Sequence, residues 1–223
     1  MMNNDITEQT VRTAQLGSVD LAEADLSGSA LPGAIWPVKN LSGSNLQDVQ
    51  FQEAKLPYAN LNRVSADFAI FTGADLSGAQ MSGGSFDYID LTGANLKRVF
   101  AARSEFRHAK LPDADLTGAH LFEVDLTRAN LTDAIMSGVY LEGAYLKKAN
   151  LTNVNLMDAD LTGAILRKAN LSGANLSGAN LTGVDLRGAN LTGAILVGAI
   201  LTGADMRRVK GADLSGAIFE AKG

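Results

Sequence analysis

The chain has 223 residues, of which 46% are apolar and only 19% charged, and its formal net charge is −5. It contains no cysteine, which excludes disulfides, zinc–thiolate sites and thiol nucleophiles. With 8 Phe, 4 Tyr and 1 Trp it is poor in aromatic residues, whereas Leu, Ala and Gly are abundant. Such a biased composition indicates a repetitive sequence.

The first residues, MMNNDITEQTVRT, precede any regular pattern. They lack the apolar core of a signal peptide, and we predict that residues 1–13 form an N-terminal cap with one or two helical turns. The longest apolar stretch, residues 194–201, is too short to span a bilayer. We therefore expect a cytoplasmic protein without a membrane span.

A five-residue repeat extends over residues 14–208. Steps of five from Leu16 to Met206 give 39 central positions, which hold 29 Leu, four Phe, three Met, one Trp and two Ala. Two residues earlier stands a small residue, Ala in 25 repeats and Val in eight, and Gly fills the last position in eighteen. A period of five fits neither a helix nor an uninterrupted strand. It does fit a short extended piece with two inward side chains, followed by a turn at which Gly accepts positive φ.

This pattern, [Ala/Val]-[Asp/Asn]-Leu-[Ser/Thr]-Gly, resembles the pentapeptide-repeat family. The resemblance implies an all-β fold, a right-handed quadrilateral parallel β-helix of about ten four-sided coils, with the Leu and Ala positions inside. Coils about 4.8 Å apart would give a solenoid about 47 Å long. Asparagines on successive coils, at residues 130, 150, 170 and 190, would then form an amide ladder.

The N-terminal third departs from the pattern at residues 32–39. Lys39 stands at an inward position, and both Pro32 and Pro37 lack a backbone donor for pairing. We therefore expect a bulge or loop across this segment.

Two inward central positions hold alanine, which leaves too little volume for the core. These are Ala66 and Ala101, and each lies near an outward phenylalanine, Phe68 and Phe100 respectively. A local distortion that turns these two rings inward would fill the space, because interiors are closely packed.

The positions of the basic residues support four-sided coils independently. Thirteen of the 19 Lys and Arg lie in the two positions after a central residue, and nine of these thirteen share one side, where about a quarter would be expected by chance. We call these nine residues the basic column: Arg107, Arg128, Lys147, Lys148, Arg167, Lys168, Arg187, Arg207 and Arg208.

The basic column has two interpretations at this stage. It could pair with acids of the same side, Glu105, Asp125, Asp185 and Asp205, in a salt-bridge lattice. Alternatively, an acidic partner could dock along residues 107–208. The N-terminal half of the same side is acidic instead, with Asp25, Asp48, Asp67 and Asp87.

A second candidate surface is aromatic. Phe100, His120 and Tyr140 share one outward position on consecutive coils, with Phe122 nearby and Tyr145 around the corner. Exposed aromatic clusters are typical of recognition surfaces, but the same residues could simply stack and stabilise the coils.

The register slips near the C-terminal end, where Met206 and Leu214 are eight residues apart, so we treat residues 209–223 as a register-shifted end. Ile195, Val197 and Ile200 should face outward just before it. An apolar end without a cap predicts a homodimer through these residues, and a local loop that covers them is the alternative.

No enzyme signature is present. The chain has only two histidines, no Gly-x-Gly and no phosphate-binding loop, and the recurrent Asp residues before Leu follow from the repeat. We therefore expect no catalytic residues, metal, cofactor or small-molecule substrate.

The resemblance leaves two classes of function. One is a non-catalytic scaffold or regulator that binds a protein partner along one face. The other is the quinolone-resistance branch, whose members mimic duplex DNA, bind DNA gyrase and other type II topoisomerases, and protect them from quinolone-like inhibitors. Mild acidity, the lack of a C-terminal helix and the basic column favour the scaffold. Direct nucleic-acid binding is disfavoured by a pI of about 5.0.

Overall fold

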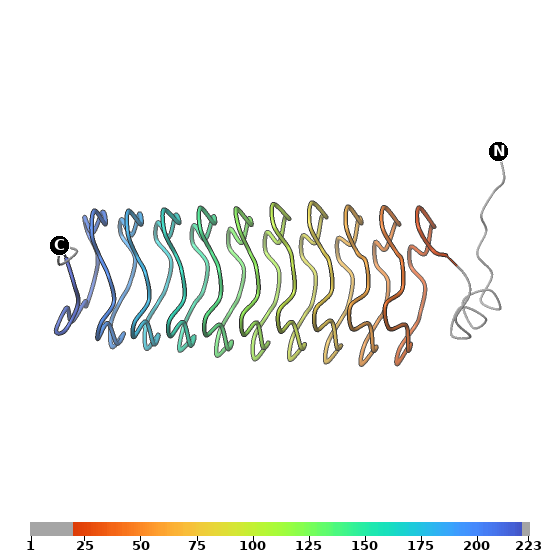
Figure 1. Cartoon of the computed structure of the whole chain (residues 1–223), viewed down its shortest axis with the longest axis horizontal. Coiled ribbons are helices and arrows are strands. Elements are labelled where there is room, and N and C mark those ends of the chain that lie inside the picture. The colour runs from red at the N-terminus through yellow and green to blue at the C-terminus, as the bar shows by residue number, and fades with distance from the viewer. Residues whose placement is uncertain (1–19, 220–223) are drawn as a thin grey trace.

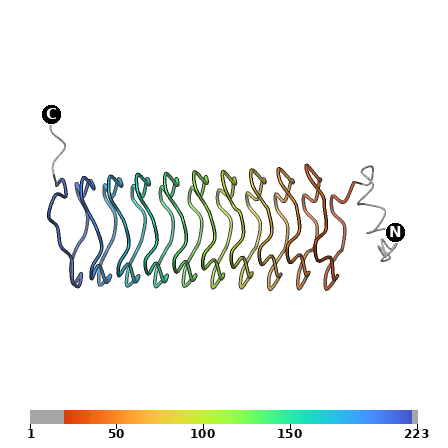
Figure 2. The same ribbon diagram turned by 90° about the horizontal axis from the view of Figure 1, so that it is seen from below.

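The computed structural model describes residues 20–219, which form one rod of stacked coils (Figures 1 and 2). The residue before each central position forms a parallel bridge with the residue twenty positions later, from Asp25 with Asn45 to Asn190 with Lys210. In this part of the chain the strands are single bridging residues, and no helix is present. Four repeats therefore make one coil, as the sequence predicted.

Each coil has four sides, which we number by the central residue that they contain. Side one holds Leu21 and every twentieth residue after it, and sides two, three and four begin in the same way at Leu26, Leu31 and Trp36. A column of residues twenty apart thus runs along one side of the rod, parallel to its axis.

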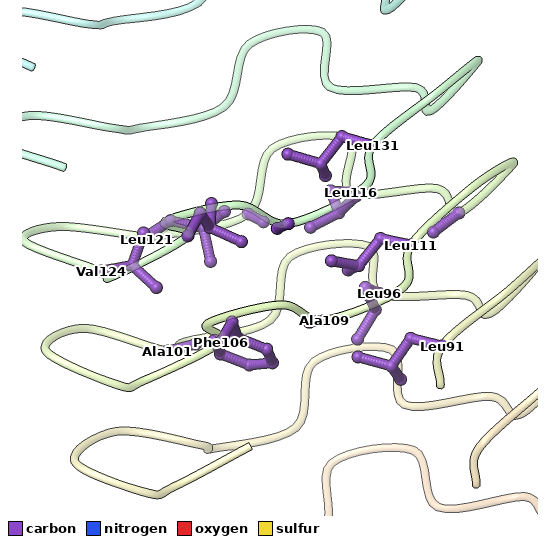
Figure 3. Packing of buried hydrophobic residues seen from close by; sticks show 14 of the residues in the cluster. Leu91, Leu96, Ala101, Phe106, Ala109, Leu111, Leu116, Leu121, Val124 and Leu131 are labelled. Carbon is purple, nitrogen blue, oxygen red and sulfur yellow. The ribbon is translucent and has the colours of Figure 1, made fainter. Parts of the chain in front are cut away.

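The interior is filled by the central and small residues of the repeat. In Figure 3 Leu91, Leu111 and Leu131 lie one above another on one wall of the rod, and Phe106 lies across from them. From coil two onward nearly every such residue is at most 5% exposed. Each fully buried Leu contributes about 1.5–3 kcal/mol relative to exposure, so this continuous core stabilises every coil against its neighbours.

The backbone hydrogen bonds explain why Asp or Asn precedes Leu. Most N–H groups in a repeat donate to a backbone carbonyl in the same turn or an adjacent coil, as Ala24 does to Leu21 and Leu26 does to Asn45. The N–H of the first turn residue has no such acceptor. An Asp or Asn side chain two residues earlier accepts it instead, as Asp25 Oδ1 does from Ser27 at 3.1 Å. The recurrent acids are therefore turn caps.

The four prolines obey the same rule, and the bulge predicted across residues 32–39 is wrong. Pro32, Pro37, Pro57 and Pro112 all stand at the first turn position, where no donor is needed and the fixed φ of proline fits. None follows an Asp or Asn cap, since the residues two earlier are Ala30, Ile35, Lys55 and Lys110. The coil continues through this segment, with the Trp36 N–H 2.7 Å from the Lys55 carbonyl. Lys39 keeps its inward position and is only 9% exposed.

The predicted inward rotation of two phenylalanines is also wrong. Ala66 and Ala101 are buried, yet Phe68 and Phe100 remain 55% and 40% exposed. Larger residues on neighbouring coils occupy the core instead. Phe86, at the position one coil after Ala66, is fully buried, and its ring lies where a Cβ on Gly84 would be only 2.6 Å away.

The corners have positive φ whether or not they contain glycine. Nineteen glycines and twenty other residues take φ between +52° and +79° at the second turn position. Among these, Val38 is β-branched and has φ of +57°. A β-branched side chain is strained in this conformation, so the corner of Val38 lowers the stability of its coil.

The last coil is shorter than the others. Ile200 bridges Ile218, eighteen residues later, and the Gly198 N–H donates to the Gly216 carbonyl at 2.8 Å. The two residues of one corner are absent between Gly211 and Ala212. The predicted N-terminal cap, residues 1–13, lies outside the described residues. Across residues 20–219 no helix is long and apolar enough to cross a membrane.

Candidate partner-binding surface

The basic column lies on side two, at the corner that follows each central residue. Its members on successive coils are one coil spacing apart, about 4.8 Å, so their charges repel unless they are compensated. In the structure some cations of the basic column pair with acids and others do not.

Three arginines at the C-terminal end form a continuous chain of ion pairs. Asp185 pairs with Arg167 and, at 2.8 Å, with Arg187. Asp205 pairs with Arg187 at 3.4 Å and with Arg207 at 2.6 Å. The hydrogen bond from Arg207 lowers the pKa of Asp205, and the same contact raises the pKa of Arg207. Both groups therefore stay charged at neutral pH.

Arg107 is paired in a similar way further along the rod. Its side chain is 2.8 Å from Asp87 and also contacts Glu105, and its backbone N–H donates to Asp87 at 2.8 Å. The hydrogen bond to Asp87 raises the pKa of Arg107. The salt-bridge lattice thus describes the arginines of the first turn position, although Asp125 takes no part and instead caps Thr127.

The other five cations of the column form no ion pair with any residue in the 20–219 range. All five are exposed, and four of them, all but Lys147, stand at the second turn position. They are Arg128, Lys147, Lys148, Lys168 and Arg208. These residues give side two its uncompensated positive charge.

A groove interrupts the column where Gly188 replaces a cation. Gly188 stands at the second turn position between Lys168 and Arg208, and a Cβ there would contact only the Lys168 Cγ, at 3.6 Å. The groove has a volume of about 480 Å³. Its lining is Gly188 with Lys147, Arg167, Lys168, Arg187, Arg207 and Arg208. The groove was not predicted from the sequence, although a glycine in a column of basic residues was the signal.

The acids of the N-terminal half of side two serve mainly as caps. Asp67 accepts the backbone N–H of Asp87 at 3.0 Å and the Ser85 hydroxyl at 2.6 Å. Asp25 caps Ser27, and Asp48 stands exposed at a corner. The sign of the charge still reverses along this side, from acidic to basic.

The predicted aromatic patch separates into a stack and two outlying rings. Phe100, His120 and Tyr140 stack on side one with centroids 4.6 and 4.7 Å apart and nearly parallel planes. Phe122 lies under the Arg103 guanidinium, 5.8 Å from it. Tyr145 is 47% exposed and belongs to side two.

A second aromatic ladder was not found from sequence. Phe68, Tyr88 and His108 stack at the second turn position of side two, with centroids 5.0 and 4.7 Å apart. They precede Arg128 in the same column, so one corner of the rod is aromatic and then cationic. Their spacing of twenty residues was the available signal. In both ladders the rings stack face to face, an arrangement that stabilises neighbouring coils against one another.

The residues predicted for a dimer contact lie near the C-terminal end of the rod. Ile195 and Val197 on side four are 49% and 60% exposed, and Ile200 on side one is half-buried. Leu214, in the last coil, is also exposed. The last coil lies beside two of these residues, since Ile200 bridges Ile218 and a Cβ on Gly216 would lie 3.5 Å from the Val197 Cα.

The described coils contain no group of three His, Asp or Glu side chains arranged to hold a metal ion. His108 and His120 belong to the two aromatic stacks, on different sides of the rod.

Comparison with known proteins identifies the repeat. The model of the family described as pentapeptide repeats matches eight copies, over residues 44–83, 59–98, 102–138, 134–173 and 169–208. No curated protein matches the chain.

Several solved proteins resemble the structure, and two of them are HetL and QnrB1. HetL of the cyanobacterium Nostoc sp. strain PCC 7120, a pentapeptide repeat protein involved in heterocyst differentiation regulation, is 28% identical with a TM-score of 0.71, over 98% of each chain. A trypsin-treated form of QnrB1, a plasmid-mediated fluoroquinolone resistance protein, is 22% identical with a TM-score of 0.60, over 74% of this chain and 87% of that one. Their shared fold confirms the predicted right-handed quadrilateral β-helix.

Proposed function

The chain belongs to the pentapeptide-repeat family, and from this membership we propose that it is a non-catalytic, rod-shaped scaffold or regulator in the cytoplasm. It binds a protein partner along the basic column of side two. HetL, which is similar over its whole length, is a protein involved in regulation. This similarity supports the class of function and leaves the partner unidentified.

The observation that carries the proposal is the line of five unpaired cations on a chain whose net charge is −5. The acids are spread over all sides by the capping rule, so they repel an acidic partner from most of the rod. The basic column attracts it to one face. Such charge complementarity accelerates encounter and fixes the orientation of a complex.

The backbone holds these cations in fixed positions. The N–H groups of Arg128, Lys148 and Lys168 donate to carbonyls of the next coil at 2.9 to 3.0 Å. The backbone under the row is therefore already ordered, and on binding only the exposed side chains lose conformational freedom.

The test is a charge reversal restricted to unpaired cations. Lys147, Lys148 and Lys168 are changed together to Glu, while Arg167, Arg187 and Arg207 are left alone because their reversal would leave Asp185 and Asp205 unpaired. The matched control reverses three exposed cations of other sides, Lys55, Arg63 and Arg98. Circular dichroism and thermal unfolding check that both variants fold.

Affinity purification from the native host with mass spectrometry gives the readout. The wild type and the control should retain one partner that the column variant loses. A partner retained equally by all three proteins would contradict the proposal.

The quinolone-resistance function is not favoured. Identity to QnrB1 of 22% supports the fold alone, and a basic column is the opposite of a DNA-like acidic surface. A gyrase supercoiling assay with a quinolone distinguishes the two functions. We expect no protection of the enzyme at micromolar protein, and protection would favour the DNA mimic.

A further inference from the structure

The walls of the groove at Gly188 are chemically uniform. Six of its seven lining residues are Lys or Arg, and no acidic, aromatic or aliphatic side chain lines it. The charge of these six side chains favours an anionic ligand, to which Lys and Arg donate charge-assisted hydrogen bonds.

The arginines keep donors free for a ligand while their acids hold them in place. Arg187 uses Nε and Nη2 toward Asp185, and Arg207 uses the same two atoms toward Asp205. The Nη1 group of each has no acceptor among the described residues, although a guanidinium carries five N–H donors. These acids orient the guanidinium groups without closing the groove.

The spacing of the cations selects among anions. Successive coils place cations about 4.8 Å apart, whereas acidic side chains on one face of an extended peptide recur only about every 6.7 Å. The peptide would therefore leave the register of the cations within two coils. A linear chain of phosphates has a charge on every unit, so it can place oxygens opposite each cation.

We propose that this groove binds a linear oligophosphate, laid along the rod axis from the coil of Lys147 to the coil of Arg207. The groove crosses three coil spacings, about 14 Å, so a chain of three phosphates would occupy part of it and longer chains more. The inference goes beyond the binding of a protein partner and stands without it, because it requires only the groove. Bound oligophosphate would neutralise this end of the basic column and so compete with any acidic protein that docks there.

The probe is sodium tripolyphosphate, titrated into the full chain by isothermal calorimetry at low ionic strength. We expect saturable binding that weakens as salt is added, because the cations are exposed and screened. Orthophosphate should bind more weakly, since it reaches fewer cations. A Glu-rich peptide and a doubly phosphorylated peptide complete the series.

The decisive variant is Gly188→Lys, which adds a positive charge and also fills the hollow. The fold accepts it, because Lys168 occupies the same position one coil earlier with φ of +58°. Affinity for tripolyphosphate should fall, because the added side chain takes up the space in which the phosphates lie. The matched control Gly183→Lys stands at the same corner position of side one, with no atom within 4 Å of its Cβ, and should bind as the wild type does.

Lys168→Gln provides a second test that leaves Gly188 and its corner unchanged, and it should also weaken binding. No binding of tripolyphosphate by the wild type would overturn the inference. Equal or tighter binding by Gly188→Lys would overturn it too, because charge without the hollow would then suffice. Tighter binding of either peptide would overturn the assignment to oligophosphate. The partner proposal is judged by a separate readout, the retention of a host protein when three lysines are replaced and the glycine is left in place.

Discussion

The amide ladder on side three allows a prediction whose size follows from the hydrogen bonds. Asn150 Oδ1 accepts from the Thr152 N–H at 3.3 Å and from its hydroxyl at 2.7 Å. The Asn150 Nδ2 donates to Thr132 Oγ1 at 2.8 Å and to Asn130 Oδ1 at 3.2 Å. The Asn170 Nδ2 donates to the Asn150 Oδ1 at 3.5 Å. Five half-buried bonds at about 0.5–1 kcal/mol each predict that Asn150→Ala lowers the free energy of unfolding by about 2.5–5 kcal/mol.

Asn155 supplies the matched control, since it stands before Leu156 in the same coil but makes only one described side-chain bond, from the Met157 N–H at 3.2 Å. Asn155→Ala should therefore cost about 1 kcal/mol. Urea unfolding followed by circular dichroism measures both values, with equal m-values required for the comparison. Equal losses in the two variants would refute the reasoning, because the bonds between coils would then contribute nothing beyond the local cap.

Three other expectations concern strain, pH and assembly. Val38→Gly should raise the free energy of unfolding by about 1 kcal/mol in urea, because relief of left-handed strain exceeds the entropy cost of glycine. Burial would raise the pKa of Asp115, but hydrogen bonds from Thr117 and Lys97 outweigh it and lower the pKa. Its carboxylate therefore stabilises the fold above about pH 4, and this contribution is lost as the pH falls through the lowered pKa. Asp115→Asn, which keeps an acceptor but does not titrate, should lose less stability than the wild type between pH 7 and pH 2. Light scattering should show a dimer that Ile195→Asp together with Ile200→Asp converts to a monomer.

Each of these expectations has a control. Gly33→Val should lower the free energy of unfolding, because Gly33 stands at a neighbouring corner with φ of +66° and no atom within 4 Å of its Cβ. An unchanged free energy of unfolding would contradict the strain argument. Identical acid unfolding of wild type and Asp115→Asn would contradict the assignment of Asp115. A monomeric mass for the wild type, unchanged by the isoleucine substitutions, would contradict the dimer.

The fold was predictable because one period governs both the core and the surface. The central and small residues give the buried positions, and the cations give the number of sides. The errors came from treating single residues without their place in the turn. Pro32 and Pro37 looked like breaks in pairing, but the N–H that they lack is the one that the coil leaves to side-chain caps.

The surface was less predictable, because it depends on which neighbours are paired. The sequence located the basic column, but Arg187 and Lys168 looked equivalent until Asp185 was placed between Arg167 and Arg187. The groove was not apparent because it results from a missing side chain, at Gly188. The ladder of Phe68, Tyr88 and His108 was missed because Phe68 was considered only as a means of filling the core.

The twenty-residue coil also restricts which insertions and deletions the rod can accept. Duplication of one repeat would preserve the core but rotate everything that follows by a quarter turn. A duplication of one repeat between Lys147 and Arg167 would thus move the later cations to another side and divide the groove. Only gains or losses of whole coils keep the surface in phase, so natural variation in the length of this rod should occur in steps of twenty residues wherever side two is under selection.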